Sequence, residues 1–141
     1  MYSYQYPRAA LTTDALVFAK EKNTTFVLLI ERGSEPFKNK WALPGGFIEM
    51  DETLEDACKR ELAEETGLIV DKMTQFKTYD AIDRDPRHRT ISTIYFAELD
   101  KKQQVTGGDD AARADWFPIS DLPELAFDHA QILREFFELD E

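Results

Sequence analysis

The sequence is poor in cysteine and in cationic side chains, and it contains no long apolar run. One cysteine among 141 residues cannot form an internal disulfide and fits a reducing compartment. No apolar segment approaches the length of a membrane span, and the opening Met-Tyr-Ser-Tyr-Gln-Tyr-Pro lacks the basic and apolar regions of a signal peptide. We therefore expect a cytoplasmic protein with no membrane partner.

The charge balance is strongly acidic. The chain has 17 lysines and arginines against 28 aspartates and glutamates, which gives a net charge of -11. Because nucleic acids attract cationic surfaces, we expect no nucleic-acid partner. Small phosphorylated substrates are still compatible with this charge, since divalent cations can lie between carboxylates and phosphates.

Paired cysteines and a His-x-x-x-His motif are also absent, so we expect no zinc site. Glycine and proline are scattered, without a linker or an internal repeat. Hydrophobic residues make up 43 % of the chain, which is enough for a buried core. We expect a single domain spanning residues 1–141.

The order of the secondary-structure signals predicts an α/β fold. Apolar and β-branched segments indicate strands, and a capped amphipathic pattern indicates helices. Asp51 or Thr53 is expected to cap the first helix, Gly67 to follow its end, and Asp128 to cap the second helix. The expected strands cover residues 10–19, 25–33, 41–43, 73–82, 90–99 and 113–119, and the expected helices cover residues 51–66 and 128–139. This order predicts a mixed β-sheet sandwiched between α-helices.

The first helix carries acidic residues on its apolar side. Glu61 lies seven residues after Leu54, and Glu65 lies seven residues after Cys58. A heptad turns a straight helix by only about 20°, so both glutamates should project with the core residues. Half-buried carboxylates need a partner, and we expect Arg60 to serve only one of them. A hard divalent cation such as Mg²⁺ would serve the rest.

Pro44-Gly45-Gly46 precedes this helix. Two glycines leave bare backbone, which lets a carbonyl or amide approach a metal or a phosphate. A simple tight turn is the alternative for this segment by itself. We interpret this segment and the acidic helix that follows it as the two parts of a site for a metal and a phosphate.

These residues resemble the Nudix box, Gly-x5-Glu-x7-Arg-Glu-Val/Ile/Leu-x-Glu-Glu-x-Gly-Val/Ile/Leu. Every defined position from Gly46 to Leu68 is filled. The resemblance implies the Nudix fold and hydrolysis of a diphosphate linked to another moiety, with Mg²⁺ or Mn²⁺. It also implies roles for matching residues: Glu61 and Glu65 as metal ligands, Glu64 as a further ligand, the Gly45 carbonyl as a backbone ligand, Arg60 as the residue that orients a glutamate, and Glu52 as a support.

The general base lies outside the box in many members of this family. Asp109 and Asp110 are candidates, with Asp110 preferred of the two, and Glu64 is the other choice. A flexible turn is the alternative interpretation of the two aspartates.

The stretch from Asp83 to Ser92 and the last part of the chain resemble the ADP-ribose pyrophosphatase branch of the family. This resemblance implies substrate contacts from the arginines and from the glycine of the box. The candidates are Arg32, Gly46, Arg84, Arg87 and Arg89. The alternative for the three arginines around Pro86 is a solvated loop of mixed charge.

We expect hydrolysis of ADP-ribose to AMP and ribose 5-phosphate. A MutT-like nucleoside triphosphate pyrophosphatase and a non-catalytic ADP-ribose sensor are the alternatives. The complete box, the acidic charge and the absence of a following DNA-binding domain before Glu141 favour the enzyme over the sensor. A homodimer is possible, since family members often pair through their N-terminal strands. His129 is expected to be structural.

Overall fold

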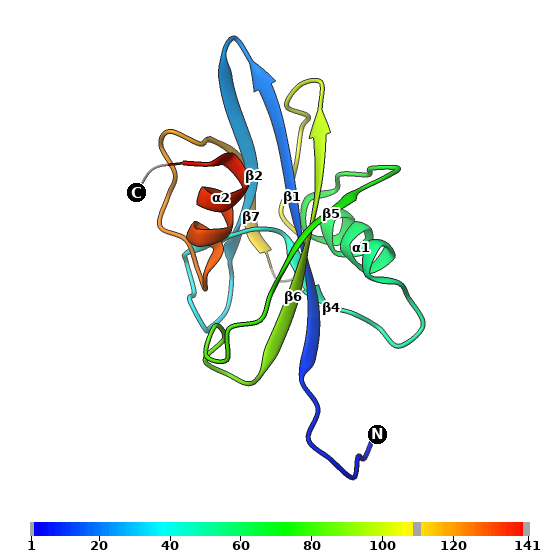
Figure 1. Cartoon of the computed structure of the whole chain (residues 1–141). Coiled ribbons are helices and arrows are strands. Elements are labelled where there is room, and N and C mark those ends of the chain that lie inside the picture. Colours follow the sequence, from blue (N-terminus) through cyan, green and yellow to red (C-terminus); the bar gives the residue numbers. More distant parts are fainter. Residues whose placement is uncertain (1, 109–110, 140–141) are drawn as a thin grey trace.

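The computed structural model describes residues 2–108 and 111–139. In Figure 1 a β-sheet runs through the middle of the molecule, with the two helices on opposite sides of it. The elements in chain order are β1 (Ala10–Glu21), β2 (Thr24–Arg32), β3 (Trp41–Ala42), β4 (Gly45–Phe47), α1 (Leu54–Thr66), β5 (Thr74–Tyr79), β6 (Thr90–Leu99), β7 (Ala111–Pro118) and α2 (His129–Phe137). The predicted α/β architecture is confirmed. None of the described helices is long and apolar enough to cross a membrane.

The sheet is mixed because β1 and β6 run parallel while the other pairs are antiparallel. Its main strand order is β3-β2-β1-β6-β5, with β4 paired to β1 and β7 paired to β2. Strands β1 and β2 form an antiparallel hairpin. Lys22 and Asn23 form its turn with φ values of 50° and 69°, as a tight hairpin between twisted strands requires.

Gly45 and Gly46 do not form a simple tight turn, which was the alternative interpretation of this segment. Gly45 and Gly46 belong to β4, which pairs with the first half of β1. The second half of β1, from Phe18 to Glu21, pairs with β2 instead. One edge of β1 is therefore shared by two strands, and β4 occupies the part that β2 leaves open. This pairing places the glycines beside Asp14.

Helix α1 begins later than predicted. Thr53 caps it, with the Thr53 hydroxyl oxygen accepting a hydrogen bond from the Asp56 amide at 3.1 Å. The expected start at Asp51 is therefore wrong, although Thr53 was one of the two expected caps. Gly67 ends the helix with φ of 77°, a left-handed conformation that favours glycine. Its amide donates to the Ala63 carbonyl.

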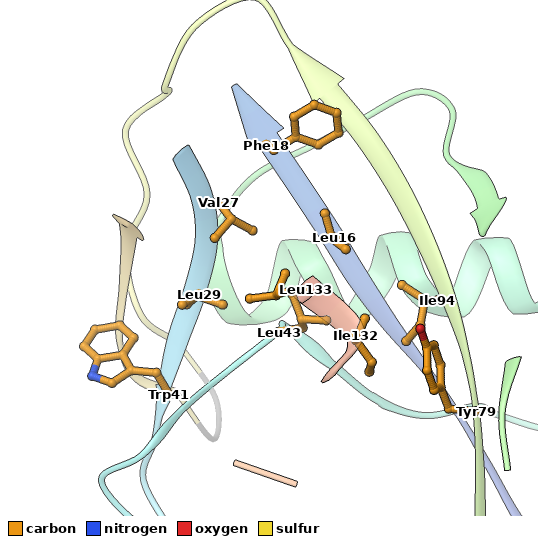
Figure 2. Close-up of a cluster of buried hydrophobic side chains, with 10 residues drawn as sticks. All are labelled: Leu16, Phe18, Val27, Leu29, Trp41, Leu43, Tyr79, Ile94, Ile132 and Leu133. Atoms are coloured by element: carbon orange, nitrogen blue, oxygen red, sulfur yellow. The ribbon is translucent and has the colours of Figure 1, made fainter. Parts of the chain in front are cut away.

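Both faces of the sheet are covered, so alternate residues of β1 enter different clusters. Leu16 packs in a cluster that includes Ile132 and Leu133 of α2 (Figure 2). Val17 packs with Cys58 and Leu62 of α1. This arrangement explains why β1 is apolar along most of its length.

The second helix begins at His129, and the Asp128 side chain makes no capping hydrogen bond. The expectation that Asp128 caps the helix through its side chain is wrong. Its carboxylate binds Arg84 instead, which neutralises a buried guanidinium, while the His129 amide at the start of the helix donates to the Ala126 carbonyl at 3.1 Å.

Candidate functional site

A cavity of about 430 Å³ lies against β4 and the first half of β1, within the ~300–1,000 Å³ range of small-molecule sites. The described lining contains both acidic and basic side chains. The carboxylates include Asp14, Glu61, Glu65 and Asp85, and the guanidiniums include Arg32, Arg84 and Arg87. Arg60 and Glu49 also line it. The cavity therefore offers ligands for cations and for anions at the same time.

Glu61 and Glu65 point inward from α1, as the heptad spacing predicted. The Glu65 residue is 6 % exposed, and its Oε1 atom accepts a hydrogen bond from the Gly45 amide at 2.8 Å. A Cβ atom on Gly46 would lie 2.5 Å from Oε2 of Glu61. The Gly45 amide thus holds the Glu65 carboxylate, and the missing side chain of Gly46 leaves space for the Glu61 carboxylate.

Arg60 contacts several glutamates. Its guanidinium donates to Glu52 at 2.6 and 3.0 Å, to Glu61 at 2.6 Å and to Glu64 at 3.2 Å. It also donates to the Phe47 carbonyl at 3.1 Å. Of the two inward glutamates Arg60 binds Glu61, in line with the expectation, and its fork of five donors also reaches Glu52 and Glu64. These hydrogen bonds raise the pKa of Arg60, and the bond from Arg60 lowers the pKa of Glu52.

Glu64 lies at the edge of the site. Its side chain is 41 % exposed, and Glu64 does not belong to the described cavity lining. Gly108 packs on its backbone, since a Cβ atom on Gly108 would lie 2.5 Å from the Glu64 carbonyl oxygen. Asp109 and Asp110 follow directly, and both lie outside the described residues. The choice between Glu64 and Asp110 as the base stays a prediction.

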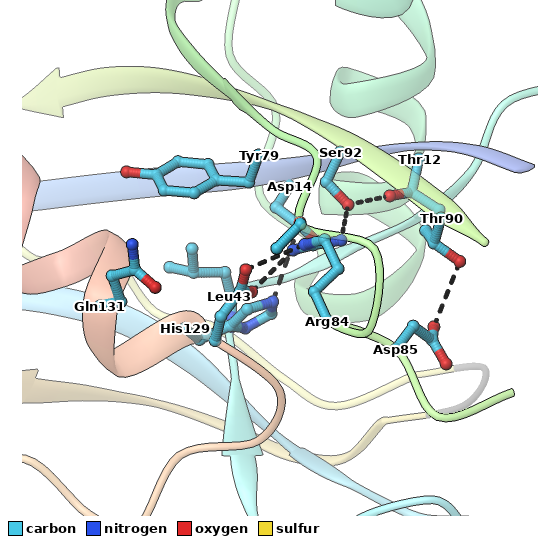
Figure 3. Close-up of polar contacts among 12 residues, drawn as sticks. Thr12, Asp14, Leu43, Tyr79, Arg84, Asp85, Thr90, Ser92, His129 and Gln131 are labelled. Atoms are coloured by element: carbon cyan, nitrogen blue, oxygen red, sulfur yellow. Dashed lines mark hydrogen bonds and ion pairs between the residues drawn. The ribbon is translucent and has the colours of Figure 1, made fainter. Parts of the chain in front are cut away.

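Arg84 is almost fully buried, with its side chain 4 % exposed. It donates to both carboxylate oxygens of Asp128 at 2.9 and 2.7 Å. It also donates to the Ser92 hydroxyl at 2.6 Å (Figure 3). Ser92 in turn is hydrogen-bonded to Thr12. Three of the five N–H donors of Arg84 thus bind the protein, so this residue joins the loop before β6 to the start of α2.

The other candidate arginines differ in their surroundings. Arg87 lines the cavity, pairs with Asp85 at 2.8 Å, and places its guanidinium 5.7 Å from the ring of Phe127. Arg32 lies on the same ring at 5.0 Å. Arg89 donates to a loop carbonyl at 3.3 Å and is not among the described lining residues. The geometry therefore brings Arg32 and Arg87 together and leaves Arg89 outside.

Two further residues of the site were missing from the predicted set of functional residues. Asp14 and His129 both line the cavity, and the His129 Nδ1 atom accepts a hydrogen bond from the Leu43 amide at 3.0 Å. The proton of the neutral ring is therefore on Nε2, which lies 3.8 Å from Oδ2 of Asp14. A single acidic residue inside an apolar strand was the available signal for Asp14.

The charge states of this pair follow from burial. Burial lowers the pKa of His129 to about 4, and the amide donor at Nδ1 also opposes a second ring proton. Burial raises the pKa of Asp14 to about 7, against the opposing effect of the nearby Arg84 guanidinium. The contact between them is thus not an ion pair at neutral pH.

The donor set suits a hard divalent cation. The Glu61 and Glu65 carboxylates both line the cavity and offer oxygen atoms, and the Gly45 carbonyl stays a predicted backbone ligand. The described residues contain no group of three or more His, Cys, Asp or Glu side chains that could by themselves hold a metal ion. Mg²⁺ usually binds one or two carboxylates and completes its shell with water and substrate phosphates. The residues present therefore fit Mg²⁺ or Mn²⁺ in a site that a phosphate-bearing substrate completes.

The family described as NUDIX domain matches residues 9–139. The chain therefore belongs to the Nudix family, and it is a Nudix pyrophosphohydrolase. Within the family it falls in the branch similar to ADP-ribose pyrophosphatases, since it is 40 % identical to the ADP-ribose pyrophosphatase of Methanocaldococcus jannaschii. That alignment covers 93 % of this chain and 75 % of the relative.

Other relatives combine the same domain with further parts. The chain is 32 % identical to the ADPR responsive transcriptional repressor NtrR of Acinetobacter baylyi, covering 94 % of this chain and 54 % of the repressor. It is 33 % identical to the NUDIX domain of Shewanella oneidensis NrtR complexed with ADP ribose, with a TM-score of 0.88 over 94 % of this chain and 89 % of that one. Because one relative is a transcriptional repressor, the absence of a nucleic-acid partner stays a prediction, as do the cytoplasmic location and the homodimer.

A bifunctional enzyme has the same fold. The NMN adenylyltransferase/ADP ribose pyrophosphatase of Francisella tularensis, complexed with AMP and a manganese ion, is 31 % identical with a TM-score of 0.85. The match covers 96 % of this chain and 43 % of that protein. The chain thus spans about half or less of two of these relatives.

Proposed function

We propose that the protein hydrolyses ADP-ribose to AMP and ribose 5-phosphate with Mg²⁺ or Mn²⁺. The observation that carries this proposal is the shared cavity, in which two inward carboxylates and several guanidiniums line the same space. The similarity to an ADP-ribose pyrophosphatase and to a domain complexed with ADP ribose supports the choice of substrate.

Glu61, Glu65 and the Gly45 carbonyl hold the cation in this proposal. A cation held by these residues would supply charge to offset the phosphate oxygens and would lower the pKa of an attacking water. The Arg60 guanidinium keeps the Glu61 carboxylate in place through a bond of 2.6 Å, and Glu52 holds Arg60 in turn. These contacts fix the carboxylate before substrate binds, which reduces the reorganisation that the reaction requires.

The basic side chains bind the substrate in this proposal. Arg32 and Arg87 face the cavity from two different segments and hold anionic oxygens by charge-assisted hydrogen bonds. The space beside Gly46 holds the Glu61 carboxylate, since a Cβ atom there would lie 2.5 Å from Oε2 of Glu61; contact between Gly46 and the substrate stays a prediction. Arg84 acts through the placement of Ser92 and Asp128, since both bind its guanidinium.

The first experiment measures AMP release from ADP-ribose with and without Mg²⁺. We expect metal-dependent AMP release that falls by orders of magnitude in Glu65→Gln, with the far-ultraviolet spectrum unchanged. Asp56→Asn is the matched control, because Asp56 is an exposed acidic residue of the same helix. Equal turnover in Glu65→Gln and the control would contradict the proposal.

The base is assigned by a pair of variants. Glu64→Gln and Asp110→Asn each remove one candidate carboxylate. The base variant is expected to lower kcat by about 10²–10⁴-fold with little change in KM, while the other variant keeps most of the activity. Equal and small losses in both would exclude both residues as the base.

A sensor without turnover is the second candidate, and the similarity to the NtrR repressor favours it. Calorimetry in Mg²⁺ distinguishes the two functions, because a sensor binds ADP-ribose and releases no AMP. A substrate panel with ADP-ribose and 8-oxo-dGTP tests the MutT-like alternative in the same way.

A further inference from the structure

The start of α2 contacts the segment that leads into the glycine strand. His129 is 4 % exposed, and its Nδ1 atom accepts a hydrogen bond from the Leu43 amide at 3.0 Å, across 86 positions in the sequence. Figure 3 shows the His129 ring beside Leu43, close to Asp14 and Arg84. A buried histidine therefore holds the backbone two residues before Gly45.

The backbone from Leu43 to Gly45 is bonded at each step. The Pro44 carbonyl accepts a hydrogen bond from the Ala15 amide at 2.7 Å. The Gly45 amide donates to Oε1 of Glu65 at 2.8 Å. The Leu43 peptide is thus two residues from the amide that holds Glu65.

The second nitrogen of the His129 ring, Nε2, lies near a residue that is also a neighbour of Gly45. Nε2 of His129 lies 3.8 Å from Oδ2 of Asp14. Asp14 pairs with Gly45 in the sheet, and a Cβ atom on Gly45 would lie 2.9 Å from the Cα atom of Asp14. The ring of His129 therefore contacts both Leu43, two residues before Gly45, and Asp14, which pairs with Gly45 in the sheet.

We propose that His129 is a positioning residue for the cation site, in which its Nδ1 atom holds the Leu43 peptide and thereby sets Gly45 beside Glu65. This role rests on the proposed function, because it assumes that Gly45 and Glu65 bind the metal. It differs from simple packing, since it depends on one acceptor atom and not on the volume of the side chain.

The test compares two substitutions at His129. His129→Asn keeps an acceptor near the position of Nδ1, and His129→Leu fills space without one. Ile132→Val is the control, because it trims a fully buried residue one turn further along α2 whose side chain cannot accept a hydrogen bond from the Leu43 amide. Mn²⁺ affinity is measured on protein without substrate by electron paramagnetic resonance.

We expect His129→Leu to weaken Mn²⁺ binding by about 10-fold or more, the size found for supporting residues around metal ligands. His129→Asn should recover most of the affinity, and Ile132→Val should bind as the unchanged protein does. In steady-state assays His129→Leu should lower kcat more than it raises KM. Equal Mn²⁺ affinity in His129→Leu and the unchanged protein overturns the inference, as does a loss in His129→Asn as large as that in His129→Leu.

A nuclear magnetic resonance measurement on the unchanged protein decides the case in which His129→Leu does not fold. The ring should carry its proton on Nε2, and the Leu43 amide should exchange slowly. A proton on Nδ1 overturns the inference. If the wild-type protein binds no Mn²⁺, both the proposed function and this inference are contradicted. If the wild-type protein binds Mn²⁺ and the His129 variants bind it equally well, only the positioning role of His129 is contradicted.

Discussion

Gly46 lies against the carboxylate of Glu61, and a Cβ atom at this position would be 2.5 Å from Oε2 and 2.7 Å from Cδ of that side chain. Real Cβ atoms do not come so close to other atoms. Glu61 can therefore hold its inward position only because residue 46 is a glycine and has no side chain.

The first prediction concerns Gly46→Ala. The new methyl group meets the end of a flexible side chain, so Glu61 should move while the fold is kept. We expect Mn²⁺ affinity to fall about 10-fold or more, with a small change in thermal stability, measured by metal titration and thermal denaturation.

Gly45→Ala is the informative comparison. A Cβ atom on Gly45 would meet backbone atoms of Thr13 and Asp14, which cannot rotate away as a side chain does. This variant should be destabilised strongly, by about 1–3 kcal/mol or more, whereas Gly46→Ala should not. Similar melting temperatures for the two variants would contradict the reasoning.

The second prediction concerns Arg60→Lys. Lysine keeps the charge but offers one donor centre in place of the planar fork that reaches Glu52, Glu61 and Glu64. We expect activity to fall about 10–100-fold and the free energy of unfolding to fall by about 1–3 kcal/mol, measured by AMP release and urea denaturation. Activity equal to that of the unchanged protein would show that the position of Glu61 does not depend on this fork.

The third prediction concerns the ion pair of Arg84 and Asp128, whose side chains are 4 % and 16 % exposed. Asp128→Leu leaves a buried guanidinium without its carboxylate, and we expect a loss of about 3–5 kcal/mol in the free energy of unfolding. Replacing both residues, in Arg84→Met with Asp128→Leu, should recover a large part of the loss. Chemical denaturation of the single and double variants measures this coupling.

An exposed pair provides the control for that experiment. Arg113 is 67 % exposed and binds Glu31 at 3.0 Å. Arg113→Ala should cost less than about 1 kcal/mol, as is usual for surface ion pairs. A similar loss in both experiments would mean that burial does not determine the effect.

The fourth prediction concerns stability in acid. Hydrogen bonds from Lys77, Gln131 and Tyr79 lower the pKa of Glu135 to about 2, from its usual value of 4.5. Between these two values the unfolded chain binds the proton first, so the contribution of Glu135 to stability is complete above pH 4.5 and is lost as the pH falls towards 2.

The measurement compares the unchanged protein with Glu135→Gln. The difference between their free energies of unfolding should be largest above pH 4.5 and should shrink as the pH falls towards 2, followed by urea denaturation at several pH values. Lys77→Ala should reduce the same difference, because Lys77 donates to Glu135 at 2.8 Å. A difference that does not change with pH would contradict the prediction.

The sequence by itself determined the helix that carries the acidic residues and the side from which Glu61 and Glu65 project. Helical geometry is local, so seven-residue spacing from Leu54 and Cys58 fixes a direction without knowledge of the rest of the chain. The hairpin of β1 and β2 and the glycine at the end of α1 were predictable for the same reason. Each depends on neighbouring residues only.

Only the tertiary structure decided which distant groups meet. Asp14, Leu43 and His129 come together from three segments, and Asp128 binds Arg84 across 44 positions. Pairing of β4 with β1 also depends on the edge that β2 leaves open. Such contacts follow from how the helices and strands pack, and no spacing along the chain encodes them. The inward direction of the carboxylates is therefore a local property, and their support is a property of the whole fold.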